Sequence, residues 1–468
     1  MTDPDSDRRT IPSVDKIIQA LAFRELPHEI VLFVVREYVN IIRKKRKIPA
    51  FDLIVTQLRK ELRAIELRRI KPTVNGSGVI LHTNLGRAPL APQVVQYMSE
   101  IGQTYSNLEM DLPTGNRGNR GQYLELCLSI LCRSESAIVV NNCAAALILV
   151  IRHFTSGDQK SVIISRGELI QIGGGFRIPE ILESSGAYIR EVGTTNRTTV
   201  KDYERAINRD TALILKVHRS NFAMEGFVES PTTENIKLLA NTYRLPLIED
   251  LGSGALVDTA QNTSLEHEPT PAEVLRKGVD LVCFSGDKLM GGPQAGIIAG
   301  KEVIVDALKK EPFFRALRSD KLILAALQST AELYLRQKSN KEIPVFQMLH
   351  DSVAKLRKRG EKIARSLKGL PIKIHINDGE SQIGGGALPK SSIPSVTIDL
   401  APTSKNLELL TSELRQGTPP VIGYISNQHL RLDLRTIFET QDESLSCAIR
   451  SALESKPTWT ENSKQTPG

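Results

Sequence analysis

The sequence predicts an α/β protein in which a large domain with a mostly parallel sheet follows a small helical N-terminal domain and precedes a smaller α+β domain. Three changes of pattern predict it. Apolar residues recur at helical spacing before residue 67, short apolar runs alternate with longer amphipathic ones from Ala137, and the pattern becomes mixed after residue 330. We therefore predict domains at residues 1–66, 67–330 and 331–456, and a disordered tail at 457–468.

The first domain is predicted to be helical and basic. The stretches "IIQALAF" and "IVLFVVREYVNII" place apolar residues on one helix face, and Pro27 and Pro49 separate the helices. The net charge of the chain is +8, and residues 1–74 contain 16 Lys and Arg against 10 Asp and Glu, with the run "RKKRK" at residues 43–47. Such a run is either a solvated helix face or a contact for a polyanion, and the residues alone leave both open.

The central section contains a series of short apolar runs. They read "AIVV", "SVIIS", "AYIREV", "TALILKV", "LPLIED", "DLVCFS" and "AGIIAG". Each run predicts a buried strand, and the amphipathic segments between them predict the crossover helices of a parallel sheet. In the last section, "IPSVTIDL" and "HLRLDLRT" predict strands beside helical segments.

The composition excludes several classes of protein. The cysteines are odd in number, five, and lack Cys-x-x-Cys spacing, so we expect neither a disulfide framework nor a metal site. No apolar run approaches the length of a membrane-spanning helix, and no export signal is recognised near Met1. We therefore expect a protein of the reducing cytoplasm that makes no membrane contact.

One lysine occupies an unusual position in "VCFSGDKLMGGPQAG". Lys288 follows an apolar run that predicts an interior strand, although lysine is among the residues least often buried. It is either a strand-end lysine that reaches water or a Schiff-base lysine made nucleophilic by desolvation. The residues that follow the other strands distinguish between these alternatives.

Ligands of an open parallel sheet bind at the carboxyl ends of its strands, and three such ends carry a matching set of groups. A helix that starts after "AIVV" offers N–H groups for a phosphate, Asp250 follows "LPLIE", and Lys288 follows "LVCFS". Pyridoxal phosphate needs this set, because a lysine forms its imine, a carboxylate keeps its pyridine nitrogen protonated and a helix end binds its phosphate. The further candidates for cofactor contacts are Asn141, Asn142, Cys143 and Ala144 at the helix start, Ser285 for the phosphate, and Asn221 or His218 for the phenolic oxygen.

Longer stretches of the sequence resemble one family, the bacterial selenocysteine synthases or L-seryl-tRNA(Sec) selenium transferases. The resemblance extends from about Asn75 to Arg435, and "HTNLGRA" and "SGDKLMGGPQAGII" are its most specific parts. The other matching stretches are "SRGELIQIGGGFRIPEI", "EVGTTNRT", "LIEDLGSGALVD", "ALRSDK" and "SQIGGGALP".

This resemblance implies a fold-type-I pyridoxal-phosphate enzyme with active sites at a dimer interface and dimers assembled into a ring, a decamer in the family. It also implies a reaction in which serine esterified to tRNA(Sec) loses its β-hydroxyl and takes selenium from selenophosphate. By the same resemblance Lys288 is the imine lysine and proton shuttle, Asp250 is the partner of the pyridine nitrogen, and Asp287 is an acidic catalytic-site residue whose role is not implied.

The resemblance further implies the binding of both substrates. Arg87, Arg315 and Arg318 match residues that bind the selenium donor, although related sequences carry Lys at the position of Arg315. The basic N-terminal domain, with Arg43, Lys44, Lys45, Arg46 and Lys47, is implied to contact the tRNA. Two alternatives stay open: a related pyridoxal-phosphate lyase acting on a small amino acid or amino sugar acid, and a non-enzymatic tRNA-binding protein on the same fold. The sequence also leaves open whether selenium or sulfur is donated.

Overall fold

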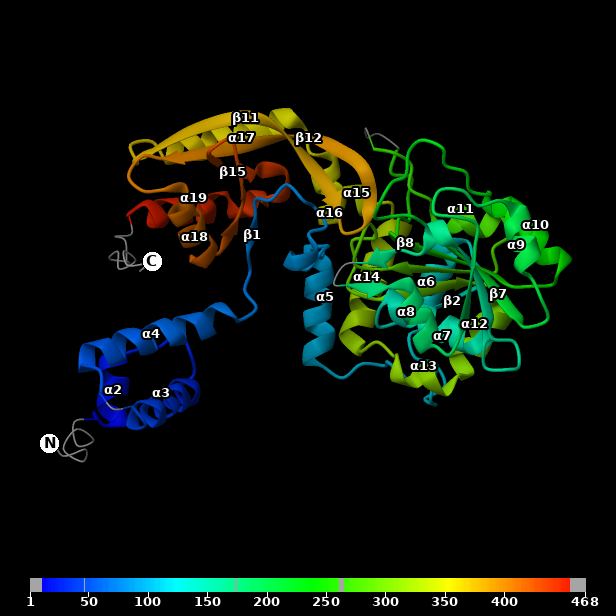
Figure 1. The fold of residues 1–468 in the computed structure, drawn as a ribbon, viewed down its shortest axis with the longest axis horizontal. Helices are drawn as coiled ribbons and strands as arrows, with labels where there is room; N and C mark the ends of the chain where they lie inside the picture. Colours follow the sequence, from blue (N-terminus) through cyan, green and yellow to red (C-terminus); the bar gives the residue numbers. More distant parts are fainter. Residues whose placement is uncertain (1–10, 46, 173–174, 261–264, 455–468) are drawn as a thin grey trace, which may run out of the picture. The chain divides into compact units, whose positions relative to one another are not determined.

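The computed structural model describes residues 11–45, 47–172, 175–260 and 265–454 (Figure 1). The chain forms two compact units, Met1–Thr73 with Ser412–Val421, and Val74–Thr411 with Ile422–Gly468. The predicted disordered tail, 457–468, lies outside the described residues. The predicted domain boundary at residue 330 falls inside a helix of the second unit, Lys321–Leu335.

The helices of the first unit are amphipathic, as the spacing of apolar residues predicts. Its described part contains α2 (Val14–Leu21), α3 (His28–Arg43) and α4 (Phe51–Leu67). One face of each helix contributes to a shared core that includes the buried side chains Ile17, Val35 and Leu58. Pro27 precedes the first residue of α3, where its missing N–H costs no helical hydrogen bond.

The second unit is organised around a large sheet, and every predicted strand of the central section is present in it. The strands are β2 (Ser136–Val140), β3 (Ser161–Ser165), β6 (Tyr188–Val192), β7 (Thr211–Val217), β8 (Leu247–Gly252), β9 (Leu281–Ser285) and β10 (Gly296–Gly300). Among the described residues their order is β2-β10-β9-β8-β7-β3-β6, and β10 runs antiparallel to both of its neighbours. The sheet is therefore mostly parallel, as predicted.

Helices cover both faces of this sheet, and each face has its own apolar core. Elements that contribute to the first core include α5 (Pro92–Gln103), α6 (Gln122–Cys132), α9 (Val200–Ala206), α10 (Thr233–Thr242), α11 (Pro271–Arg276), α14 (Lys321–Leu335) and α16 (Pro344–His350). Those that contribute to the second include α7 (Cys143–Phe154), α8 (Ile178–Ser184), α12 (Glu302–Lys310) and α13 (Pro312–Ala316). Burial on both faces explains why the strand sequences are continuous apolar runs.

A second sheet follows in the chain and is antiparallel, with the order β11-β12-β15-β14. Its strands are β11 (Ile372–Gly384), β12 (Ala387–Pro402), β14 (Tyr424–Ser426) and β15 (His429–Asp433), so "IPSVTIDL" and "HLRLDLRT" are strands as predicted. The helices of this section are α15 (Ser339–Glu342), α17 (Val353–Ser366), α18 (Leu407–Gln416) and α19 (Asp442–Glu454). Short elements complete the described chain: β1 (Val74–Asn75), β4 (Gln171–Ile172), β5 (Phe176–Arg177), β13 (Val421–Ile422), and the 3-10 turns Thr83–Leu85, Arg166–Glu168, Leu434–Thr436 and Glu439–Gln441.

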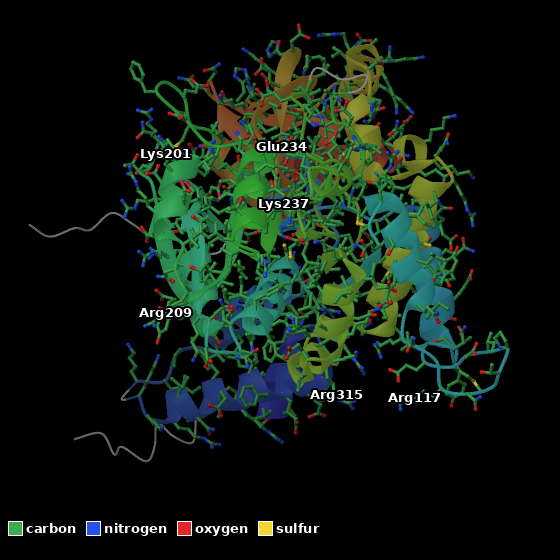
Figure 2. All side chains as sticks on the ribbon, turned by 90° about the vertical axis from the view of Figure 1, so that its right-hand side faces the viewer. Arg117, Lys201, Arg209, Glu234, Lys237 and Arg315 are labelled. Carbon is green, nitrogen blue, oxygen red and sulfur yellow. The ribbon has the colours of Figure 1, made fainter. Side chains whose placement is uncertain are left out.

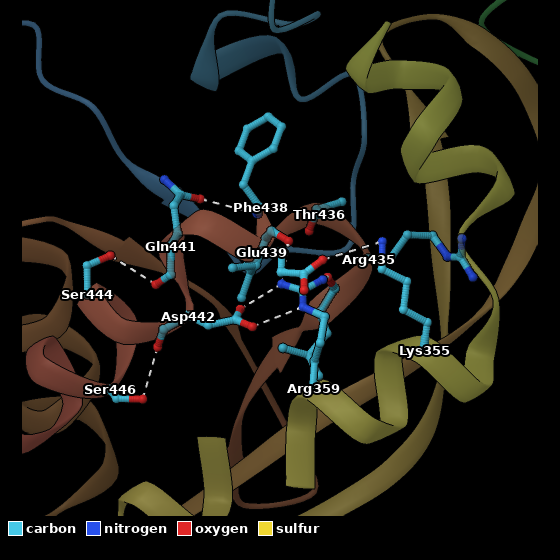
Figure 3. Close-up of polar contacts among 12 residues, drawn as sticks. Lys355, Arg359, Arg435, Thr436, Phe438, Glu439, Gln441, Asp442, Ser444 and Ser446 are labelled. Carbon is cyan, nitrogen blue, oxygen red and sulfur yellow. Dashed lines mark hydrogen bonds and ion pairs between the residues drawn. The ribbon is translucent and has the colours of Figure 1, made fainter. Parts of the chain in front are cut away.

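A buried arginine fixes α17 to the start of α19 (Figure 3). Two guanidinium nitrogens of Arg359 donate to the carboxylate of Asp442, Nη2 at 2.7 Å and Nε at 3.1 Å. The same guanidinium donates to the carbonyl oxygens of Leu434 and Ile437. Arg359 is only 7% exposed. The ion pair therefore supplies the hydrogen bonds that water would otherwise make with the guanidinium and the carboxylate.

We expect Arg359→Ala to destabilise the protein by about 3 kcal/mol, because it leaves Asp442 and two carbonyl oxygens without their donor. The midpoint of thermal unfolding should fall clearly. Lys355→Ala is the matched control, since Lys355 is half-exposed and its ion pair with Asp351 is worth less than about 1 kcal/mol. Equal effects of the two changes would show that the buried pair has no special role.

Candidate active site

Lys288 lies in the connection from β9 to β10. This connection, residues 286–295, is too short for a helical crossover, so the chain turns back and β10 pairs antiparallel with β9. Lys288 consequently stays at the carboxyl end of β9. Its side chain does not reach water, because the residue is only 5% exposed.

Among the described residues, two cavities of about 330 and 130 Å³ meet at Lys288. Both are lined by Lys288, Asp250, Gly252 and Arg87. The backbone of Gly252 has a φ of +64°, and a Cβ there would lie 3.6 Å from the Lys288 Nζ. Glycine at this position therefore adopts the positive φ that the end of β8 requires, and it leaves the space beside the Lys288 amine free.

Asp250 lies near the carboxyl end of β8, next to β9, and is buried. Burial raises the pKa of Asp250, and the positive charge of Lys288 opposes this rise. The Cys143 thiol donates to Asp250 Oδ1 across 3.5 Å, and burial raises the pKa of that thiol so that it stays protonated. A carboxylate made more basic by burial is suited to hold a proton shared with a ligand nitrogen.

The larger cavity also meets the N-terminus of α7. Asn142 caps this helix, because its Oδ1 accepts from the N–H of Ala145 at 2.9 Å. The N–H groups of Cys143 and Ala144 belong to the first turn, which has no intrahelical acceptors. Asn142, Cys143, Ala144 and the buried Ser285 all line the cavity, whereas Asn141 does not and instead donates its backbone N–H to Leu317.

His218 and Asn221 line the smaller cavity. The Asn221 side chain donates through Nδ2 to the carbonyl of Gln171 at 2.7 Å, but its buried Oδ1 has no hydrogen-bond partner among the described residues. His218 Nε2 lies 2.9 Å from the carboxylate of Glu268. Both predicted residues are thus near Lys288, and Asn221 has the free polar atom.

Arg87 and Asp287, which both line the larger cavity, form an ion pair with 2.8 Å between Nη1 and Oδ2. The two residues are 200 positions apart in the chain. Asp287 is buried and faces the larger cavity beside Lys288. Its carboxylate therefore holds the Arg87 guanidinium against both cavities.

The predicted arginines of the segment "FRALRSD", Arg315 and Arg318, are not part of this site within one chain. Arg315 is exposed and points outward from α13 (Figure 2). Arg318 lines a different cavity of about 280 Å³ together with Arg120 and Lys309. The backbone N–H of Asn141 donates to the carbonyl of Leu317, which connects this segment to the start of α7.

The predicted tRNA-binding run begins at the end of α3. Arg43, Lys44, Lys45 and Lys47 are exposed, and Arg46 lies outside the described residues. Arg43 is the last residue of α3, and Lys44, Lys45 and Lys47 follow the helix.

Comparisons with known proteins identify the family. The family model described as L-seryl-tRNA selenium transferase (SelA) matches residues 73–438. The chain is 43% identical to the L-seryl-tRNA(Sec) selenium transferase of Carboxydothermus hydrogenoformans, over 92% of this chain and 95% of that one. It is 40% identical to the enzyme of the same name from Aquifex aeolicus, over 95% and 98% of the two chains. The chain belongs to the L-seryl-tRNA selenium transferase family.

A solved structure extends this result to the fold. The D-glucosaminate-6-phosphate ammonia-lyase is 19% identical, covers 82% of this chain and 96% of its own, and superposes with a TM-score of 0.57. The predicted fold-type-I architecture is confirmed. The predicted cofactor is confirmed as well, because the L-seryl-tRNA selenium transferase family depends on pyridoxal phosphate.

The residues of the site fit this cofactor. A buried lysine amine, a buried carboxylate and the first turn of α7 surround one cavity, and Asn221 Oδ1 is a buried acceptor that has no partner in the described part of the chain. Lys288 would hold pyridoxal phosphate, Asp250 would face its pyridine nitrogen, and the N–H groups of Cys143 and Ala144 with Ser285 would face its phosphate.

The family stretch "SQIGGGALP" has a structural role that the sequence alone did not reveal. Gly384, Gly385 and Gly386 form the tip of the β11–β12 hairpin, all with positive φ. A Cβ on Gly386 would lie 3.8 Å from Lys288 Nζ, and Gly385 and Gly386 line the smaller cavity. The hairpin thus brings glycine backbone close to Lys288, and the run of three glycines was the sequence signal for this approach.

We expect Gly296→Ala to weaken cofactor binding. A Cβ on Gly296 would lie 2.2 Å from the carbonyl oxygen of Asn142 and 2.9 Å from the nitrogen of Cys143, so the start of α7 must move. The dissociation constant for pyridoxal phosphate should rise at least about tenfold, the loss of one hydrogen bond to a charged group. Gly157→Ala, where a Cβ meets nothing within 4 Å, is the control. Absorbance titration of the apoprotein measures both, and equal affinities would contradict this account of the helix start.

Proposed function

We propose that this chain converts L-seryl-tRNA(Sec) into L-selenocysteinyl-tRNA(Sec), with selenophosphate as the selenium donor and phosphate as the second product. One observation carries the proposal: Lys288 and Asp250 face one cavity in a chain that belongs to the L-seryl-tRNA selenium transferase family. The names of the relatives support the choice of substrate.

The residues of the site have different roles in the proposed reaction. When bound, pyridoxal phosphate supplies an electron sink that stabilises negative charge at the α-carbon of the seryl group. Lys288 Nζ holds the cofactor and moves the proton of that α-carbon. Asp250 keeps a proton at the pyridine nitrogen, and Asp287 orients the guanidinium of Arg87.

Selenophosphate is bound, in this proposal, by Arg87, Arg315 and Arg318. The serine carboxyl is esterified to tRNA, so the arginines of this site are free for another anion, and a planar guanidinium can donate two parallel hydrogen bonds to an oxyanion. Arg315 and Arg318 do not line the Lys288 cavity of their own chain. We therefore propose that they complete the site of a partner subunit in a homodimer, and that dimers assemble into a decameric ring.

The tRNA is bound, in this proposal, by the helical domain of residues 1–66, with the cations at 43–47 in contact with phosphates. The cytoplasm is the proposed compartment. Among the described residues, no helix combines the length and the apolar composition that crossing a membrane requires.

The decisive experiment incubates the full chain with pyridoxal phosphate, seryl-tRNA(Sec) and selenophosphate, and analyses the amino acid on the tRNA by mass spectrometry. We expect selenocysteine. Omission of selenophosphate, and its replacement by thiophosphate, are the controls that distinguish selenium from sulfur as the donated atom. Unchanged serine in the complete reaction would contradict the proposal and favour a lyase of the ammonia-lyase kind or a binding protein.

A further inference from the structure

The outer face of α17 is a second concentration of positive charge. Residues 353–368 contain seven Lys and Arg and one acidic residue, Glu361. The inner face of the helix is buried and includes Leu356, Arg359 and Ile363. Lys358, Lys362 and Arg365 lie on the opposite face and are exposed.

Within the described residues, these three cations have none of the ion pairs that neutralise their neighbours. Lys355 pairs with Asp351 at 2.8 Å. Arg357 pairs with Asp378. In the described parts of the chain, no carboxylate lies within 4.0 Å of Lys358, Lys362 or Arg365 in an ion pair. We call these three residues the α17 basic face.

The helix that carries the α17 basic face is held firmly. Arg359 binds Asp442 through two nitrogens, and Arg450 Nη2 donates to the carbonyl of Ser366 at 2.8 Å (Figure 3 shows the former contact). The three cations span about 10 Å along the helix. They are therefore displayed at fixed spacing and need little ordering on binding.

The shape and composition of this face select the kind of partner. A small anion needs side chains that converge in a concave site, whereas these three project from a convex helix. A lipid surface would need large apolar residues beside the cations, but the other exposed residues of the helix are Ala354, Lys355, Glu361 and Ser366. An extended polyanion with regularly spaced phosphates suits the face.

The charge distribution of the chain points to the same partner. Residues 1–74 and 353–368 each carry a net charge of +6, while the whole chain carries +8, so the remainder is net negative. The two basic regions belong to different compact units. We propose that the α17 basic face is a second contact for the phosphate backbone of the substrate tRNA, an inference that rests on the proposed function.

The test is a triple variant of the full chain, Lys358→Ala with Lys362→Ala and Arg365→Ala, titrated with seryl-tRNA(Sec) at several salt concentrations. The affinity should fall at least about tenfold near 0.1 M salt, and the slope of log affinity against log salt should shrink by about 2 to 3. The control triple, Lys201→Ala with Arg205→Ala and Arg209→Ala, removes the same charge from exposed positions elsewhere; Figure 2 labels Lys201 and Arg209 at the surface. It should bind as the unmodified chain does.

A second measurement does not depend on folding of the variant. Bound tRNA should protect Lys358 and Lys362 of the unmodified chain from acetylation, and should leave Lys201 reactive. Unchanged affinity and slope in the triple variant, or equal reactivity of Lys358 with and without tRNA, would overturn the proposal while conversion of seryl-tRNA by the unmodified chain continued. A chain that neither binds nor converts seryl-tRNA would overturn the proposed function and this inference with it.

Discussion

Lys288→Ala should leave the protein folded and lower the conversion of seryl-tRNA(Sec) by at least about 10³-fold, because it removes both the nucleophilic amine and the group that moves the α-proton. Folding should be spared, since among the described residues no hydrogen bond or ion pair joins Nζ to the rest of the protein. Single-turnover assays measure the rate. Borohydride treatment followed by peptide mass spectrometry should attach the cofactor to the peptide that contains Lys288, and the variant should show no such adduct.

Lys301→Ala is the matched control for this experiment. Lys301 also follows a strand of the same sheet, but β10 runs antiparallel to β9, so Lys301 lies at the opposite edge, 53% exposed and paired with Asp280. We expect normal activity and a normal adduct in that variant. An adduct on another lysine, or full activity of Lys288→Ala, would refute the role of Lys288.

The large sheet could be predicted from the sequence because strands that are buried on both faces have continuous apolar sequences. The run "TALILKV", for example, has no polar alternation, and β7 has the same bounds, Thr211–Val217. The direction of β10 was harder to predict, because an apolar run reads alike in either direction. The direction of β10 is set by the length of the connection at 286–295, which is too short for a crossover helix. Connection length is a geometric constraint that the composition of the strand does not show.

The groups around Lys288 were predictable in part, for a related reason. Asp250 lies near the carboxyl end of β8 and Asn142 follows β2, and the carboxyl ends of parallel strands meet at one edge of a sheet. The ion pair of Arg87 with Asp287 and the approach of Gly386 to Lys288 depend on segments far apart in the chain. No local pattern encodes such contacts. The family resemblance proposed Arg315 and Arg318, and a single chain does not bring them to Lys288.

Asp250→Asn should preserve the fold and lower the rate of conversion by about 10² to 10³-fold, the cost typical of removing one preorganised electrostatic partner. The amide has the shape of the carboxylate, and its oxygen can still accept from Cys143. It carries no negative charge, so it cannot keep a proton on the pyridine nitrogen. The single-turnover rate and the affinity for pyridoxal phosphate are the two measurements.

The affinity should fall less than the rate, because the first turn of α7 still offers its N–H groups to the phosphate. Glu249→Gln is the control, since Glu249 is the adjacent residue of the same strand, and its carboxylate accepts from Thr233 and does not line either cavity at Lys288. That variant tests whether loss of a buried carboxylate in β8 is itself harmful. If Asp250→Asn kept a normal rate, or if Glu249→Gln lost as much, the pyridine nitrogen would need another partner, and the burial that raises the pKa of Asp250 would have no catalytic purpose.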